Sequence, residues 1–492
     1  MIEIDTLEGF DRWSRDPDGP AAVQGLDLRS RCDLLCELRS PGTLFLACEL
    51  TPHSAGWLVQ NGAVVVPDLP DRAFTVHRSR LYAAEELYDR FDPARLESFA
   101  DCLDQRIYRQ YLADGKSKPR SMAVGLWQGL HDHSISDALW ELLDGHRVVA
   151  VMGGHGMERR DLRYRTVVYI AKDLAERGYL MVSGGGPGAM EATHLGVWLA
   201  HRPSSDVEAV LASDFARRPS GSTAGTEYAD ADWLVRAWRV RQRWPRVTQS
   251  ISVGMPTWLY GHEPPTPFAT HIAKYFANSI REDGVLSVAN HGVVFAPGSA
   301  GTMQEIFQDA CQNHYGTTGQ ISPMILLDRG YWTSTKPAFP LIEQVSAGRR
   351  YGELLALVDS REDVVDLIQR FEPAWYRVSA DPFESLLTEL RHDLRLRSNW
   401  SFETLDLEAL SGERECFDLG DVDRLVGWLY DLGGDDWIDR DRATGFWTRL
   451  LLDDTIKLCM QKLGPGPALH SAEALVVGIG DRKIAWRAVL AD

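Results

Sequence analysis

The middle of this chain alternates short apolar runs with longer amphipathic stretches, and this alternation limits the possible folds more than any other feature. The apolar runs have the length of strands, and the stretches between them have helical spacing. The predicted strands are Arg147–Met152, Tyr179–Ser183, Ser250–Met255, Gly292–Ala296 and Met324–Leu327, and the predicted helices are Arg163–Arg177, Ala189–Ala200, Thr270–Arg281 and Thr302–Asn313. Strands that alternate with helices pair in parallel, so the pattern predicts an α/β fold with a Rossmann-like parallel sheet flanked by helices.

Three regions follow from this pattern. Residues 145–371 form the Rossmann-like domain, which closes with the strand LLALV and the helix EDVVDLIQRF. Residues 1–130 contain the strand-like runs GTLFLACEL and GAVVVPDLP and predict an N-terminal α/β accessory region. Residues 378–492 predict a mainly helical C-terminal domain, with a small core built from tryptophans: Trp400, Trp428, Trp437, Trp447 and Trp486.

The charge balance restricts the partners. The 492 residues include 52 Lys and Arg against 70 Asp and Glu, a formal net charge of −18. Such a field repels polyanions and anionic lipid, so we expect no nucleic acid polymer and no membrane among the partners. A small phosphorylated ligand remains compatible, because a few backbone N–H groups can hold one phosphate locally. The seven cysteines lack paired CxxC spacing, and the acidic N-terminus has no apolar segment, which predicts a cytoplasmic protein.

Two glycine-rich turns follow the first two predicted strands. Gly153, Gly154 and His155 come directly after RVVAVM, and the second turn lies in SGGGPGAMEA, which opens a helix. The N–H groups of such a turn can converge on an anion, which the positive end of the helix dipole also attracts. Glu191 could stabilise the helix dipole instead of contacting ribose. The second glycine-rich turn could serve close packing of strand and helix instead of binding an anion. The candidate binding residues of the second turn are Gly184, Gly185, Gly186, Gly188, Ala189, Met190 and Glu191.

A third strand, turn and helix lie in APGSAGTMQEIFQDA. Glu305 lies three residues after Thr302, in the first turn of the predicted helix, so the pair also matches a capping box. A carboxylate beside an anion cradle suits a phosphorylated sugar, because it can stabilise positive charge at the anomeric carbon. The candidate phosphate-binding residues are Gly298, Ser299, Ala300, Gly301 and Thr302.

These motifs resemble those of the LONELY GUY (lysine-decarboxylase-like) superfamily. PGSAGTMQE is similar to its PGGxGTxxE signature, and GGGPGAME is similar to its GGGxxGLMG. The resemblance is closer to the bacterial nucleotide 5′-monophosphate nucleosidases, which carry GGH, GPGAMEA, EPPNP and PGGxGT in this order. The matching segments here are Gly153–His155, Gly186–Ala192, Glu263–Pro267 and Pro297–Thr302.

The resemblance implies hydrolysis of the N-glycosidic bond of a nucleoside 5′-monophosphate, without a metal or another cofactor, by a homo-oligomer (a dimer or tetramer). Glu305 would stabilise the oxocarbenium ion and activate water. The family's arginine on the preceding helix has two candidates here, Arg281 and Lys274, and Arg281 is preferred because a guanidinium can grip phosphate with two hydrogen bonds. Arg281 could instead offset the dipole at the C-terminus of its helix. The alternative function is a non-catalytic nucleotide-binding sensor or regulatory protein.

Two other groups of polar residues carry weaker signals. His131, Asp132 and His133 invite a metal site, but a solvated loop before a helix is the preferred interpretation. The acids of LGGDDWIDRD, residues 432–441, lack the spacing of a calcium-binding loop and predict a solvated turn.

Overall fold

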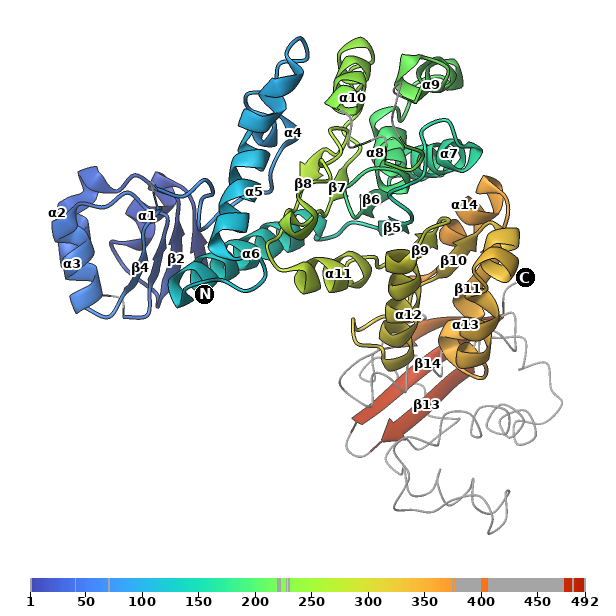
Figure 1. Ribbon diagram of the computed structural model, residues 1–492. Helices are drawn as coiled ribbons and strands as arrows, with labels where there is room; N and C mark the ends of the chain where they lie inside the picture. Colours follow the sequence, from blue (N-terminus) through green and yellow to red (C-terminus); the bar gives the residue numbers. More distant parts are fainter. Residues whose placement is uncertain are drawn as a thin grey trace. The chain divides into compact units, whose positions relative to one another are not determined.

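The computed structural model describes residues 2–39, 41–69, 71–218, 223–226, 228, 231–373, 376, 400–405, 473–479 and 482–490. The contacts within the chain define two units. One comprises Met1–Cys311 with Ser322–Phe371, and the other comprises Gln312–Ile321 with Glu372–Asp492. Figure 1 shows the elements of both units coloured along the sequence.

The first unit contains a seven-stranded parallel sheet in the order β11-β10-β9-β5-β6-β7-β8 (Figure 1). The strands are β5 (Val148–Met152), β6 (Leu180–Ser183), β7 (Ser252–Gly254), β8 (His271–Ile272), β9 (Val293–Phe295), β10 (Met324–Leu327) and β11 (Leu355–Val358). The strand order reverses between β5 and β9, which pair directly although β6, β7 and β8 lie between them in the chain. In open α/β sheets, ligands bind at the carboxyl ends of the strands beside such a reversal.

The helices of this sheet confirm the predicted Rossmann-like fold class. They are α7 (Leu162–Glu176), α8 (Ala189–Trp198), α9 (Ser204–Leu211), α10 (Ala231–Arg243), α11 (Asn278–Ser287), α12 (Ala300–Tyr315), α13 (Phe339–Ser346) and α14 (Arg361–Arg370). Every residue of β5 is buried, as expected for a parallel strand covered on both faces. Val149 and Val151 of β5 belong to one apolar cluster with residues of α7, α8 and α14.

The predicted helix Thr270–Arg281 is wrong. This segment contains β8 and an irregular stretch, and α11 begins only at Asn278. Ala273, Lys274, Tyr275 and Phe276 are all buried. A segment that is buried on every side has no exposed face, so its periodicity could not separate a helix from an extended stretch.

The N-terminal region confirms the predicted α/β architecture. Its four strands pair in parallel in chain order: β1 (Ile2–Ile4), β2 (Ala21–Gln24), β3 (Leu44–Leu46) and β4 (Val64–Val66). The helices α1 (Leu7–Trp13), α2 (Cys32–Glu37) and α3 (Pro52–Gln60) belong to this sheet, and Phe10, Leu35 and Phe45 lie fully buried in its core. Three further helices lead to β5: α4 (Ala84–Leu87), α5 (Leu103–Asp114) and α6 (Met122–Leu143).

The solvated loop expected at His131–His133 is also wrong, because these residues lie inside α6. His131 and Asp132 are buried, at 0% and 1% exposure, and only His133 is exposed. Each buried polar side chain has partners within the protein. The His131 ring contacts Tyr82 and Asp132, and Asp132 accepts backbone N–H groups.

In the second unit, the described residues beyond position 376 form an antiparallel sheet in the order β12-β14-β13. Its strands are β12 (Trp400–Leu405), β13 (Glu473–Ile479) and β14 (Arg482–Leu490), which the helical pattern of residues 378–492 did not predict. Trp428, Trp437 and Trp447 and the turn at 432–441 lie outside the described residues. Within the part of the chain that the structure describes, no helix has both the length and the apolar character needed to cross a membrane.

Several short helical segments connect these elements. They are the 3-10 segments η1 (Arg29–Arg31), η2 (Leu96–Asp101), η3 (Asp214–Ala216), η5 (Trp258–Tyr260) and η7 (Arg350–Leu354) and the π-helical turn η6 (Tyr331–Thr335). The turn η6 follows β10 and brings Tyr331 to the glycine-rich loop after β9.

Candidate functional site

The loops after β5, β6 and β9 meet beside the reversal of strand order. The N–H of Gly154 donates to the carbonyl of Pro297 at 3.2 Å, and the carbonyl of Gly154 accepts the N–H of Ala189 at 3.2 Å. A Cβ atom on Gly154 would lie 3.2 Å from Gly298 Cα, and one on Gly188 would overlap the carbonyl of Gly154. Close contact between the loops therefore accounts for Gly154 and Gly188.

Arg281 of α11 lies over the loop after β6. A Cβ atom on Gly184 would overlap its guanidinium, so the missing side chain at 184 makes room for it. The Arg281 Nε donates to the carbonyl of Met255 at 3.1 Å, and Nη1 lies 3.8 Å from Glu305 Oε1 of α12. Both side chains are nearly buried, at 12% and 11% exposure. The structure thus brings together the two residues that the sequence analysis selected as catalytic.

The position of Arg281 in its helix excludes the alternative that it offsets the dipole. Because α11 begins at Asn278, Arg281 is the fourth helical residue, and its N–H bonds to the carbonyl of Ala277 at 3.4 Å. A cation there meets the positive end of the helix dipole, which is unfavourable by about 0.3–1 kcal/mol. The dipole at the C-terminus of this helix is therefore not the reason for an arginine at this position.

The capping-box interpretation of Glu305 is also excluded. Helix α12 begins at Ala300, which places Thr302 inside the helix and Glu305 beyond the first turn. Burial raises the pKa of the Glu305 carboxyl to about 7, the Arg281 guanidinium opposes this rise, and the Glu282 carboxylate adds to it. A carboxyl group that titrates near neutral pH can accept or donate a proton in a reaction.

The start of α12 is open to solvent. Ser299, Ala300 and Gly301 are exposed, and a Cβ atom on Gly301 would meet nothing within 4 Å. The backbone N–H groups at a helix N-terminus can bind an anion. Thr302 is buried, and its side chain packs against the Cα side of Gly298.

Two residues beside this helix start were missed by the sequence analysis. Lys336 Nζ donates to the Gly298 carbonyl at 2.9 Å and to Ser299 Oγ at 3.1 Å, and the Tyr331 hydroxyl donates to the same carbonyl. Both follow β10, whose carboxyl end lies on the same rim of the sheet. The predicted strand Met324–Leu327 was the only signal for them, since neither residue belongs to a motif.

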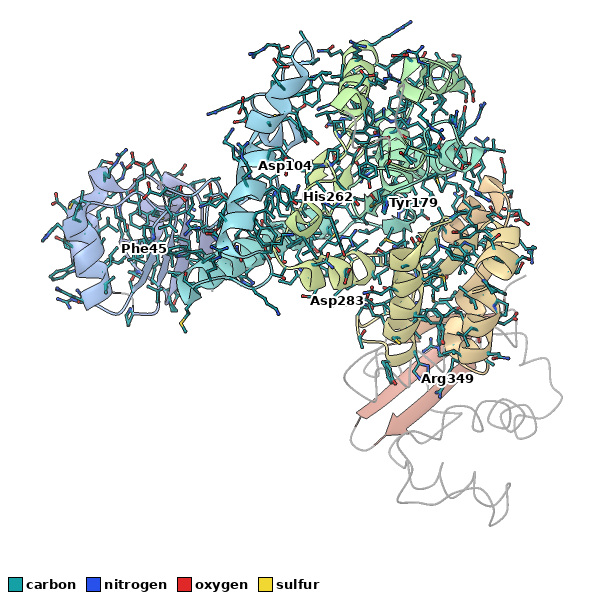
Figure 2. All side chains as sticks on the ribbon, in the orientation of Figure 1. Phe45, Asp104, Tyr179, His262, Asp283 and Arg349 are labelled. Carbon is teal, nitrogen blue, oxygen red and sulfur yellow. The ribbon has the colours of Figure 1, made fainter. Side chains whose placement is uncertain are left out.

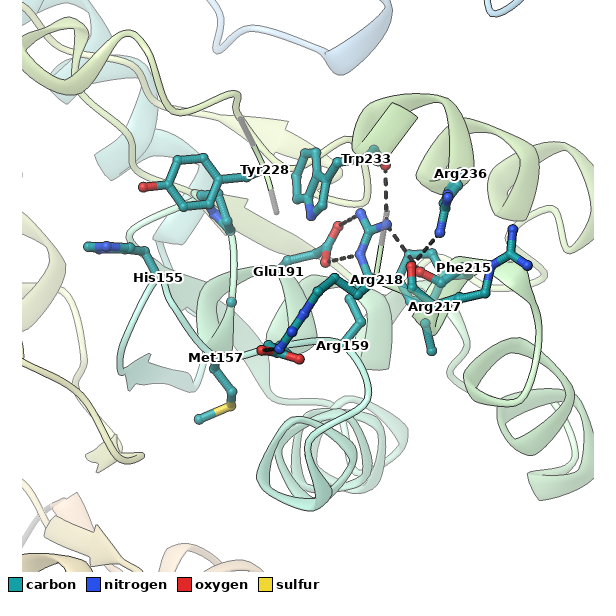
Figure 3. Close-up of a pocket in the computed structure, with 14 residues that line it drawn as sticks. His155, Met157, Arg159, Glu191, Phe215, Arg217, Arg218, Tyr228, Trp233 and Arg236 are labelled. Atoms are coloured by element: carbon teal, nitrogen blue, oxygen red, sulfur yellow. Dashed lines mark hydrogen bonds and ion pairs between the residues drawn. The ribbon is translucent and has the colours of Figure 1, made fainter. Parts of the chain in front are cut away.

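Glu191, a predicted binding residue, lies fully buried in α8. Its Oε1 accepts from Arg159 Nη2 at 2.6 Å, and its Oε2 accepts from Arg159 Nε at 2.8 Å and from the Tyr164 hydroxyl at 2.9 Å (Figure 3). Both carboxylate oxygens are thus engaged by protein groups. The whole loop from Gly184 to Met190 is likewise buried.

A pocket opens beside Gly188 and contains His155 at its edge (Figure 3). The His155 ring is 49% exposed and meets Tyr228 edge to face, with 5.7 Å between ring centroids. Arginine planes and aromatic faces are the groups on which flat heterocycles stack in proteins. The lining residues are His155, Met157, Glu158, Arg159, Pro187, Gly188, Glu191, Phe215, Ala216, Arg217, Arg218, Tyr228, Trp233 and Arg236.

Glu263, from the segment EPPTP, joins the loops from the other side. Its Oε1 lies 3.8 Å from His155 Nδ1, and a Cβ atom on Gly186 would lie 3.5 Å from its Oε2. The motif match identified this segment, but not its glutamate as a site residue.

Lys274 forms an ion pair with Asp104 and is not part of the Arg281–Glu305 pair. It is fully buried, and its Nζ donates to Asp104 Oδ1 of α5 at 2.5 Å (Figure 2 labels Asp104). Burial lowers the pKa of Lys274, and the Asp104 carboxylate opposes the shift. Of the two candidates for the family's arginine, Arg281 is therefore the one that contacts Glu305.

Three carboxylates elsewhere lie close enough to approach one cation. Oxygen atoms of Glu3, Asp137 and Glu141 lie within 4.8 Å of one another. None of them belongs to the glycine-rich loops, and exposed acidic groups of this kind are common without an ion, so they indicate no metal centre.

Comparison with known proteins places the chain in no family. No family model matches it, and no curated protein matches it. Similar solved structures include the molybdenum cofactor binding protein from the phototrophic bacterium Rippkaea orientalis and the molybdenum cofactor carrier protein from Chlamydomonas reinhardtii. Each is 13% identical and covers 46% of this chain and 97% of its own, with a TM-score of 0.29. At this identity and TM-score the likeness establishes no shared ligand or activity.

Proposed function

We propose that this chain is a LONELY GUY-like enzyme that hydrolyses the N-glycosidic bond of nucleoside 5′-monophosphates, giving a free base and ribose 5-phosphate. The observation that carries the proposal is the Arg281–Glu305 pair, at 3.8 Å, beside three converging glycine-rich loops. The motifs of this chain match those of the nucleotide 5′-monophosphate nucleosidases within that superfamily, and they occur in the same order along the chain.

The reaction needs a group that stabilises positive charge at C1′ and removes a proton from water. In this proposal the ionised Glu305 does both: it stabilises the oxocarbenium ion and accepts a proton from the attacking water. The bond from C1′ to the base nitrogen breaks and the water oxygen forms the new bond to C1′. The proton that Glu305 takes from this water is passed on to the base nitrogen, so one water is consumed and Glu305 is ionised again. The pKa of about 7 suits Glu305 to this exchange at neutral pH.

The remaining groups would bind the substrate. The open N-terminus of α12, with Lys336 beside Ser299, supplies positive potential for the phosphate. Arg281 would grip phosphate or ribose oxygens with its guanidinium. The pocket beside Gly188 supplies aromatic faces for the base.

The test is incubation of the full chain with each purine and pyrimidine 5′-monophosphate, with chromatography of the released base. We expect release from at least one of them, a rate that rises with pH through about 7 as Glu305 ionises, and no inhibition by a chelator. Glu305→Ala should lower turnover by at least about 100-fold while nucleotide still binds. Glu362→Ala, at an exposed site in α14, is the matched control and should turn over like the wild type.

The alternative, a non-catalytic nucleotide sensor, is separated by the same variants. A sensor binds a nucleoside monophosphate but releases no base from any purine or pyrimidine 5′-monophosphate. Glu305→Ala then has no turnover to lower. Base release by the wild type distinguishes the two, and calorimetry verifies that wild type and variant both bind the nucleotide.

Two further expectations belong to this proposal: the resemblance implies a homo-oligomer, dimer or tetramer, and the cysteine spacing and the acidic N-terminus predict a cytoplasmic location. Light scattering after size-exclusion chromatography tests the first, because a monomer would elute with the 55.1 kDa mass of one chain. Fractionation of the native cells tests the second.

A further inference from the structure

The start of α11 is held by a residue that lies outside the Rossmann-like sheet. Asp132, inside α6, accepts the N–H of Phe276 on both carboxylate oxygens, at 2.9 and 3.1 Å. Its Oδ2 also accepts the N–H of Ala277 at 2.7 Å. Ala277 is the residue directly before α11, so Asp132 binds the two backbone donors that lead into this helix.

These contacts bear directly on Arg281. The Arg281 N–H bonds to the carbonyl of Ala277, so both residues belong to the same first turn. A displacement of that turn carries the guanidinium with it, whereas Glu305 stays on α12. The 3.8 Å between Arg281 Nη1 and Glu305 Oε1 is already long for an ion pair, so a shift of about 1 Å would separate the two groups beyond ion-pair distance. A misplacement of this size in a catalytic site can lower the rate by about 100-fold.

Asp132 is itself held in one orientation. His131 Nδ1 lies 3.1 Å from Asp132 Oδ1, and the Tyr82 hydroxyl lies 2.9 Å from His131 Nε2. Burial lowers the pKa of His131, although the neighbouring Asp132 opposes the shift, and this favours the neutral ring. The neutral ring then donates from Nδ1 to Asp132 and accepts at Nε2 from Tyr82. A buried polar network whose members all have partners is rigid.

In the first turn, Arg281 Nε also donates to the Met255 carbonyl at 3.1 Å, whereas two other polar contacts of α11 lie farther along the helix. Glu282 accepts from Gln304 of α12 at 3.2 Å, and Asp283 accepts from Gln308 of the same helix. Both contacts are exposed, so they contribute little to the orientation of the helix. At the helix start, Asp132 accepts the backbone N–H groups, and the Tyr111 hydroxyl donates to the carbonyl of Phe276 at 3.4 Å.

We propose that Asp132 is a positioning residue for Arg281: its carboxylate fixes the first turn of α11 and thereby keeps the guanidinium against Glu305. The inference rests on the proposed function of the Arg281–Glu305 pair. The proposal also assigns a role to the region before the Rossmann-like domain, because Tyr82 and α6 supply the hydrogen-bond network that holds Asp132.

The kinetic test compares Asp132→Ala, Asp132→Asn and the control Asp137→Asn, which alters a half-exposed acid of the same helix without a bond to α11. We expect kcat/KM for base release to fall about tenfold or more in D132A, and less in D132N because Asn keeps one acceptor oxygen. D137N should match the wild type. In an Arg281→Ala background, D132A should cause no further loss, because the residue acts through Arg281. Thermal unfolding verifies that each variant is folded at the assay temperature.

A second test needs no ligand. Glutamate labelled with ¹³C at the carboxyl carbon reports the titration of Glu305 by NMR, with Glu305→Gln assigning its signal. Since Arg281 holds down the pKa of Glu305, we expect that pKa to rise above about 7 in R281A and in D132A and to stay unchanged in D137N.

Two outcomes would overturn the positioning role. One is a D132A loss that is the same with and without Arg281, and the other is a Glu305 titration that D132A leaves unchanged. A wild-type chain that releases no base refutes the proposed function instead, and the titration still decides the role of Asp132.

Discussion

At the scale of single residues, burial controls the chemistry of Glu305. The pKa of its carboxyl lies near 7 because desolvation outweighs the attraction of Arg281. The charged form is thus less stable in the folded protein than in water, so the carboxylate that the proposed reaction requires lowers the stability of the fold.

Glu305→Gln is expected to stabilise the protein in a pH-dependent manner. Below about pH 4.5 the carboxyl is protonated in both the folded and unfolded chain, and wild type and variant should be similar. As the pH rises from about 4.5 to about 7, the unfolded chain ionises first, and the wild type loses stability relative to the variant. Above pH 7 the difference in the free energy of unfolding should level off at about 3 kcal/mol. Urea unfolding at pH 4.5, 6 and 8 measures it, and a pH-independent difference would contradict this account.

At the scale of elements, glycines decide how closely the three loops approach. Gly154 contacts both neighbouring loops through its backbone. The side chain of Thr302 occupies the space where Gly298 would carry a Cβ atom, and that atom would also lie 3.0 Å from the N atom of Gly154. The approach of two strand ends thus depends on a residue without a side chain at position 298.

Gly298→Ala and Gly301→Ala should change stability in opposite directions. The added methyl at 298 overlaps Thr302, which should cost about 1–3 kcal/mol of unfolding free energy. At 301 it enters open space in the first turn of α12, where Ala is favoured over Gly by about 0.5–1 kcal/mol. Thermal unfolding of both variants is the measurement, and equal melting temperatures would refute the packing argument.

At the scale of the whole molecule, a buried ion pair joins the N-terminal region to the Rossmann-like sheet. Asp104 of α5 and Lys274 after β8 are both fully buried, and Trp258 Nε1 donates to the same oxygen of Asp104 at 3.1 Å. Close by, Tyr82 pairs through its backbone with Ile272. Residues of both regions thus hold the segment before α11.

Lys274→Met should destabilise the protein by about 3–5 kcal/mol, because it leaves the carboxylate of Asp104 buried without its cation. Combining it with Asp104→Leu should recover much of that loss, since no buried charge remains. Arg95→Met, which breaks an exposed pair with Asp92, is the control and should change stability by less than about 1 kcal/mol. Urea unfolding followed by tryptophan fluorescence is the measurement. The prediction would be contradicted if Lys274→Met alone were as stable as this control.

The sequence by itself determined the fold class and the order of the strands and glycine-rich turns of the Rossmann-like sheet except β8, and it selected Glu305 as a candidate. These depend on local properties: the period of apolar residues, and the freedom that glycine gives a turn. It also narrowed the arginine to two candidates, Arg281 and Lys274, but placed both on a helix that does not exist in that form.

Only the tertiary structure decided which candidate meets Glu305, and which unmarked residues surround the pair. Lys274 is held by Asp104, whereas Arg281 contacts Glu305 from the start of α11, and Lys336 reaches the loop after β9 from the next strand. These contacts join residues far apart in the chain. Their energies come from burial and from the removal of water around charges, and both depend on which segments lie together in the folded protein rather than on the spacing of residues along it.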